Sequence, residues 1–221
     1  MNQYIKKLGR LFFGILLCGI SMVMAINANV GLGPWNAFHV GITKHTSLTV
    51  GGAGILTGCV IVLLGTLLGQ LPGWGTLLNM VFVGLSVDFI NQLQIIPQCQ
   101  EWIPGVIMLI ISLILMGIGT YFYLSAQIGA GPRDGLMVAL VKKTDKPVWI
   151  IRNGIEAGAL LAGALLGAPI GIGTVIYVTC IGSTIQGIFR WFRFDTKNVI
   201  HRSIRDDYYL LKQIQGRKQK G

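Results

Sequence analysis

The stretch GLGPWN at residues 31–36 recurs 98 residues later as GAGPRD at residues 129–134. The same offset aligns residues 14–90 with residues 112–188 without a gap, and 21 of the 77 aligned pairs are identical, eight of them glycine pairs. Glycines at matched places indicate matched turns or matched close approaches of the backbone. The sequence therefore predicts a duplication, two copies of one structural unit.

The composition places both copies in a lipid bilayer. Of the 221 residues, 52% are hydrophobic and only 12% are charged, and the mean hydropathy is +0.66, which is far more apolar than a soluble domain. Six apolar stretches reach about 20 residues, the length of a helix that crosses the hydrocarbon core. We expect an all-α polytopic membrane protein with crossings near residues 10–30, 49–70, 75–94, 104–126, 148–168 and 173–191.

The duplication divides the chain into three parts. Residues 1–103 form the first membrane repeat, residues 104–191 the second, and residues 192–221 a basic C-terminal tail. The tail mixes basic residues with isoleucine, leucine and tyrosine, so we expect a cytoplasmic helix on anionic headgroups. Anchoring is the simpler role for this tail, and docking of a partner is the alternative.

The net charge of +10 follows the membrane side and does not gather on one binding face, so we expect no nucleic-acid partner. With both termini in the cytoplasm, 16 of the 18 basic residues fall on the inner side, as the positive-inside rule requires. Lys44 falls outside, and Arg152 lies at the inner boundary of its span.

A short helix is expected after each repeated motif, over Pro34–Lys44 and Pro132–Lys142. Each has about 11 residues, or roughly 16 Å of helix, and cannot cross. Proline at the first helical position is pre-set for a helix, and the glycines before it permit a sharp turn. We therefore predict half-helices or re-entrant helices that follow backbone hinges formed by Gly31, Gly33, Pro34, Gly129, Gly131 and Pro132.

Two topologies remain open. If the short helices do not cross, each repeat has three spans and the second repeat is inverted in the membrane. If they do cross, each repeat has four spans and the repeats are parallel, with 17 basic residues inside and Arg133 outside. The charge pattern fits both, and helix length favours the inverted arrangement.

Four side chains at the starts of the short helices are candidates for a solute site. Asn36 and Asp134 occupy equivalent third positions, where each can cap its helix. Alternatively, the two helix starts face one cavity in which Arg133 and Asp134 contact a small polar solute or a coupling ion, as half-helix ends do in inverted-repeat transporters. Trp35, equivalent to Arg133, would then form an aromatic wall; an interfacial anchor is the alternative.

Three further polar residues lie in or near the membrane. Asp88 is deep in its span, where a carboxylate needs a cavity or a partner, unless it approaches the outer interface. Glu156 follows Arg152 by four residues, so it either pairs with that arginine on one helix face or lines the cytoplasmic mouth and exchanges a proton or cation. His39, on the first short helix, is expected at headgroup level, and a protonation switch is the alternative.

Enzymatic chemistry is not indicated. The four cysteines contain no CxxC pair, and the sequence has no Walker, HExxH or GxSxG motif. We expect no catalytic residue, no metal site and no cofactor.

The motifs GLGPWN, GAGPRDG at 129–135 and the paired GxGT turns at 73–76 and 171–174 resemble the YitT/YczE-type family. The resemblance covers residues 10–190 and implies a multi-pass protein of the bacterial plasma (inner) membrane. Members of this family often carry aspartate where this chain has Asn36, so a role that needs a carboxylate there does not transfer.

The sequence favours a transporter or permease-like protein for a small polar solute, with Asn36, Arg133, Asp134 and Asp88 nearest the site. Two alternatives remain, a non-transporting scaffold or assembly factor for another membrane protein, and a solute-binding subunit that needs a separate energising module.

Overall fold

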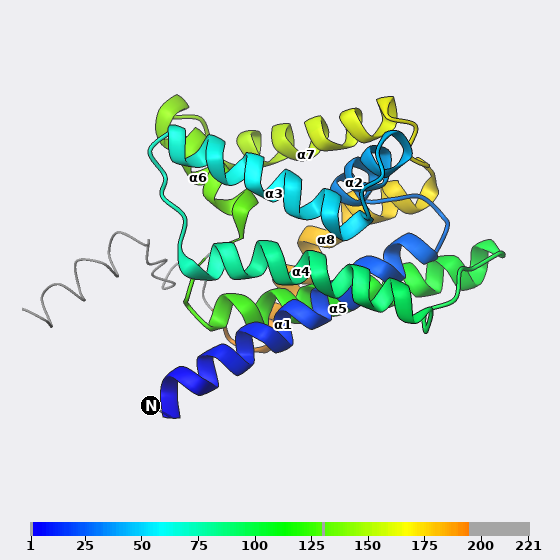
Figure 1. Cartoon of the computed structure of the whole chain (residues 1–221), viewed down its shortest axis with the longest axis horizontal. Coiled ribbons are helices and arrows are strands. Elements are labelled where there is room, and N and C mark those ends of the chain that lie inside the picture. The colour runs from blue at the N-terminus through cyan, green and yellow to red at the C-terminus, as the bar shows by residue number, and fades with distance from the viewer. Residues whose placement is uncertain (1, 130, 195–221) are drawn as a thin grey trace, which may run out of the picture.

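The fold is a bundle of α-helices (Figure 1). The computed structural model describes residues 2–129 and 131–194, and within these residues it contains eight helices and no strand. The predicted C-terminal tail falls mostly outside the described residues. The helices are α1 (Asn2–Asn27), α2 (Pro34–His45), α3 (Val50–Leu67), α4 (Trp74–Leu93), α5 (Trp102–Ser125), α6 (Pro132–Thr144), α7 (Val148–Leu165) and α8 (Ile172–Trp191).

Five of these helices are long and apolar enough to cross a membrane: α1 from Ile5, α3, α4, α5 and α8. The predicted all-α, polytopic class is therefore confirmed. The remaining predicted crossing, α7, has 18 residues and is not among the five. The two short helices α2 and α6 have 12 and 13 residues, about 20 Å of helix, and are too short to cross a hydrocarbon core of about 30 Å.

The helices form two layers, and each layer takes helices from both repeats (Figure 1). In one layer, α1 packs against α4 and α5, and α5 packs against α8. In the other, α2 packs against α3 and α7, and α6 packs against α3 and α7. The contact between α3 and α4 joins the layers. Each layer thus contains equivalent pairs of helices from residues 1–103 and 104–191.

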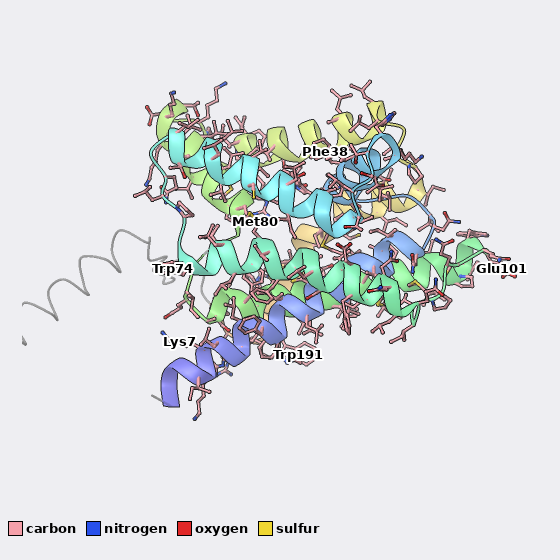
Figure 2. The ribbon with its side chains drawn as sticks, in the orientation of Figure 1. Lys7, Phe38, Trp74, Met80, Glu101 and Trp191 are labelled. Atoms are coloured by element: carbon pink, nitrogen blue, oxygen red, sulfur yellow. The ribbon has the colours of Figure 1, made fainter. Side chains whose placement is uncertain are left out.

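The equivalent helices α1 and α5 pack closely and run antiparallel. An ideal Cβ built on Gly14 would lie 2.7 Å from the carbonyl oxygen of Gly119, and the Ser21 hydroxyl donates a 2.7 Å hydrogen bond to the Ser112 carbonyl. Residue numbers therefore rise along α1 as they fall along α5. Figure 2 shows the same arrangement, since Lys7 in α1 and Glu101 before α5 lie at opposite ends of the molecule.

The hinge of each repeat is hydrogen-bonded to the last helix of the other repeat. The backbone N–H of Gly173, at the start of α8, donates a 2.7 Å bond to the Val30 carbonyl. In the equivalent bond, the N–H of Gly75, at the start of α4, donates to the Ile128 carbonyl at 3.1 Å. Backbone polar groups inside a membrane must find protein partners, and here the two repeats supply them to each other.

These hydrogen bonds require glycine at the hinge. Gly31 has φ of +118°, and an ideal Cβ on it would lie 2.7 Å from the backbone nitrogen of Gly171. An ideal Cβ on the equivalent Gly129 would lie 2.8 Å from the backbone nitrogen of Thr76. The paired glycines of the sequence therefore mark places where two backbones touch.

Gly14→Ala is expected to weaken the contact between α1 and α5, because the added Cβ would lie 2.6 Å from the backbone nitrogen of Tyr123. Overpacking of this kind costs about 1–3 kcal/mol, which should lower the melting temperature of the purified protein by roughly 2–10 °C. Gly9→Ala, on the same helix, is the control, since a Cβ there meets nothing within 4 Å. Equal melting temperatures for the two variants would contradict the close packing.

Candidate functional site

The short helices α2 and α6 each lie along the third helix of the other repeat. Ala37 of α2 lies against Gly163 of α7, and at the end of α2 the Lys44 ammonium donates a 2.5 Å hydrogen bond to the Gly167 carbonyl. The two helices therefore run in the same direction, and α2 ends beside the connection between α7 and α8.

The equivalent contact holds α6. The Lys142 ammonium, in the last turn of α6, donates a 3.1 Å hydrogen bond to the side-chain oxygen of Gln70, in the connection between α3 and α4. Because α4 begins beside the end of α5 and α8 begins beside the end of α1, the two connections lie at opposite ends of the antiparallel α1–α5 pair. The short helices therefore end at opposite ends of the molecule.

Their starts, by contrast, meet. The guanidinium carbon of Arg133 lies 4.1 Å from the centroid of the Trp35 ring, a cation–π contact worth about 0.5–2 kcal/mol. Trp35 and Arg133 are the second residues of their helices and occupy equivalent positions in the two repeats. The ring packs between Ile61 of α3 and Ala159 of α7, which are equivalent as well. We call this meeting point the junction.

Each helix presents its positive end to the junction. The residues before the helices, Gly33 and Gly131, make no side-chain capping hydrogen bond. The first backbone N–H groups of a helix have no partner within it, and the aligned peptide dipoles place about half a positive charge there. The junction therefore combines two helix N-termini with the Arg133 charge, and Arg133 itself remains exposed.

Three buried polar atoms of α2 have no hydrogen-bond partner among the described residues: Trp35 Nε1, Asn36 Nδ2 and His39 Nδ1. Their side chains are 8%, 4% and 3% exposed. An unpaired buried group costs about 1–3 kcal/mol, so three within two turns are costly. The capping role weighed for Asn36 leaves its amide nitrogen without a partner, and that nitrogen can only donate.

His39 packs inside the protein, whatever its depth in the membrane. His39 is buried and lies against α3, with its ring carbon Cε1 3.5 Å from an ideal Cβ on Gly54. The imidazole faces the interior because α3 covers α2, a packing that follows from the arrangement of the layers and leaves no mark in the local sequence.

The charged groups around Arg133 come from two helices of the second repeat. Among the groups that act electrostatically on its guanidinium, Glu156 of α7 has the largest effect, and Asp134 also contributes. The phenol oxygens of Tyr123 in α5 and Tyr177 in α8 act on it too. The structure therefore brings Trp35, Arg133, Asp134 and Glu156 into one neighbourhood, with Asn36 following Trp35 on α2.

The two hinges differ in what fills the space beside them. Beside Gly33, the Tyr177 ring lies 2.6 Å from an ideal Cβ and fills the space. Beside the equivalent Gly131, the same construction finds Asp134 Oδ2 at 3.5 Å, the Tyr123 hydroxyl at 3.8 Å and Asn79 Oδ1 at 4.0 Å. The second hinge is therefore the roomier and more polar one.

Two of these residues, Tyr123 and Asn79, were absent from the predicted site. Tyr123 is equivalent to the buried Ala25, and Asn79 is equivalent to Tyr177. The sequence did contain a signal for both residues. Like Arg133, each is a polar residue whose equivalent in the other repeat is of a different kind.

Asp88 lies away from the junction and holds the start of α3. It accepts a 2.6 Å hydrogen bond from the Thr49 hydroxyl and a 2.8 Å bond from the backbone N–H of Gly51. Asp88 follows Asn79 by nine residues on α4, roughly 13 Å along the axis. It borders a separate open cavity of about 470 Å³, which is lined by Thr43, Leu48, Thr49, Val50, Asp88, Asn91 and Gln92.

The described residues contain no group of three or more histidine, cysteine, aspartate or glutamate side chains that could hold a metal ion. The junction instead offers hydrogen-bond donors, one arginine and two carboxylates. Such a set can bind a polar solute without a metal.

The fold defines the chain as an all-helical, multi-pass membrane protein with two packed short helices. The chain belongs to the family of unknown function DUF6198, whose match covers residues 5–190. Together with the YczE relative described next, this match confirms the resemblance to YczE-type proteins.

Three relatives align over most of their length. The uncharacterized membrane protein YczE of Bacillus subtilis is 38% identical over 173 residues, which is 78% of this chain and 79% of that protein. An uncharacterized protein of Haemophilus influenzae is 33% identical over 184 residues, 83% of each chain. The uncharacterized protein YyaS of B. subtilis is 27% identical over 178 residues, 80% of this chain and 88% of that protein. No solved structure matches the chain significantly.

Asp88→Asn is expected to destabilise the protein, because an amide nitrogen would face the donor groups of Thr49 or Gly51. Loss of one hydrogen bond to a charged group costs about 1.5–3 kcal/mol, so thermal unfolding should shift downward by roughly 3–12 °C. Asn91→Ala, one turn further along the exposed end of α4, is the control. An unchanged melting temperature in Asp88→Asn would contradict the capping role.

Proposed function

We propose that this protein transports a small polar solute, and that its two repeats are inverted in the membrane. The observation that carries the proposal is the junction, where Arg133 lies 4.1 Å over the Trp35 ring and two helix starts converge. Half-helices whose N-termini meet near the middle of a bilayer are the usual way in which inverted-repeat transporters bind polar groups. The antiparallel packing of α1 and α5 supports inversion, since these helices are equivalent.

We further propose that the protein lies in the bacterial plasma membrane with both termini in the cytoplasm. The distribution of lysine and arginine supports this orientation. In this orientation α2 runs from the junction toward the outside, with Lys44 in its last turn, while α6 runs toward the cytoplasm, with Lys142 in its last turn. The helix α7, the third helix of the second repeat, then crosses the membrane while packed against α2. This contact with α2 shields part of the surface of α7, which carries charged residues.

Access to the junction would alternate by movement of one layer against the other. The two repeats are interleaved, because each hinge is bonded to the last helix of the other repeat. A repeat therefore cannot move as a unit without breaking those bonds. The layer of α2, α3, α6 and α7 could shift against the layer of α1, α4, α5 and α8 with the hinges as flexible links. Glu156, whose charge acts on Arg133, is the candidate for exchanging a proton or a coupling cation.

Uptake into proteoliposomes tests the proposal. With a radiolabelled panel of small anions, zwitterions and neutral polar solutes, at least one solute should enter faster than into empty liposomes. Arg133→Gln and Asp134→Asn should each reduce that uptake by about 10- to 100-fold, because a hydrogen bond to a charged group contributes about 1.5–3 kcal/mol. Arg190→Gln, in the exposed last turn of α8, is the matched control and should transport normally.

An assembly factor, the alternative to a transporter, predicts different results in the same experiments. An assembly factor would leave every solute outside the liposomes, and deletion of residues 196–221 would abolish capture of its membrane partner. A transporter with an anchoring tail keeps its uptake after this deletion. A panel without a transported solute, together with loss of partner capture, would therefore replace the proposed function.

A further inference from the structure

The unpartnered groups at the start of α2 are hydrogen-bond donors. Trp35 Nε1 and Asn36 Nδ2 can donate but cannot accept, and both are buried without a partner among the described residues. The first backbone N–H groups of α2 and α6 add donors of the same kind. Arg133 contributes a guanidinium that lies directly over the Trp35 ring. The buried donors of the junction therefore lack an acceptor.

The carboxylates of the junction come from the second repeat. Asp134 lies beside the Gly131 hinge, and Glu156 is on α7 and acts on Arg133. Arg133 also acts electrostatically on buried His39, so this part of α2 lies near a positive charge. A solute that satisfies these donors must bring negatively charged or strongly accepting oxygen atoms.

We infer that the junction binds the carboxylate-type oxyanion group of a small organic solute, held by Trp35 Nε1, Asn36 Nδ2 and Arg133. This inference rests on the proposed function and specifies the chemical class of its solute. An oxyanion has the lone pairs that unpaired donors need, and its charge is favoured at helix N-termini. The group could belong to a simple acid or to a zwitterion whose ammonium faces Asp134 and Glu156, and the experiment separates the two.

A matched series of four compounds tests the inference on the purified full-length protein. Acetate has the carboxylate alone, glycine has a carboxylate and an ammonium, glycinamide has the ammonium alone, and acetamide has neither. A second series, 4-methylpentanoate, leucine, leucinamide and 4-methylpentanamide, repeats the design with a larger side chain. The concentration dependence of the melting temperature gives the apparent affinity, because a ligand that binds only the folded protein raises it.

The carboxylate-bearing members should stabilise the protein, and their amides should not. Preference for acetate and 4-methylpentanoate indicates a simple acid, and preference for glycine and leucine indicates a zwitterion. Trp35→Phe keeps an aromatic ring under Arg133 but removes the Nε1–H, so it should weaken carboxylate binding by about 10- to 100-fold. Asn36→Asp replaces a donor by a like charge and should weaken it at least as much.

Trp191→Phe, at a site that is 85% exposed, and Arg190→Gln are the controls and should bind normally. Stabilisation by the amides as strong as by the carboxylates would overturn the inference. So would the absence of stabilisation by any member of either series, or equal losses in the controls and in Trp35→Phe.

Uptake of the same compounds separates this inference from the proposed function. If a carboxylate binds but does not cross proteoliposomes, transport fails and the binding chemistry stands. If only carboxylate-free members cross, transport stands and the binding chemistry is wrong.

Discussion

The mutual hydrogen bonds between hinges and helix starts are the constraint on which the structure depends. An extended hinge inside a membrane exposes carbonyl groups that lipid cannot satisfy. The start of a helix has N–H groups without partners. Each repeat has one of each, and they are exchanged between repeats, with Gly173 N–H bonded to Val30 and Gly75 N–H bonded to Ile128. The duplication thus satisfies two sets of backbone groups that one copy alone would leave unpaired.

This exchange also positions the junction. Because each hinge is tied to the opposite repeat, the helices that follow begin in the interior and run outward to opposite ends. Residues at equivalent positions of the two short helices then meet, and Arg133 lies over the Trp35 ring for this reason. Equivalent backbone positions in the two repeats therefore bring two different side chains together, an aromatic ring from the first copy and a cation from the second.

The two copies have diverged in what surrounds that frame. Tyr177 fills the space beside the first hinge, whereas Asn79, Tyr123 and Asp134 surround the second. Small backbone-contact residues must stay in both copies, since a side chain at either hinge would collide with the other repeat. Side chains that line the space between the layers are free to differ. We propose that function resides in those differences.

Much of this could be predicted from the sequence, because duplication and helix length are visible without a structure. The repeated GxGP motif predicted the hinges and the short helices, and the equivalence of residues 35 and 133 predicted their opposition. The partner of Asp88 could not be predicted in this way. Thr49 has Pro147 as its equivalent, so the cap at the start of α3 has no repeated pattern. The division into layers is likewise a property of tertiary packing. His39 is buried because this packing places α3 over α2.

The most direct test asks on which side of the membrane each short helix ends. In a chain whose four cysteines are replaced by serine, Lys44→Cys and Lys142→Cys are labelled separately in intact cells with a membrane-impermeant maleimide. Short helices that start at a shared junction in an inverted arrangement predict labelling of Lys44→Cys from outside and of Lys142→Cys only after the cells are permeabilised. If both positions are protected in intact cells and labelled after permeabilisation, the short helices cross, the repeats are parallel, and the proposed arrangement is wrong.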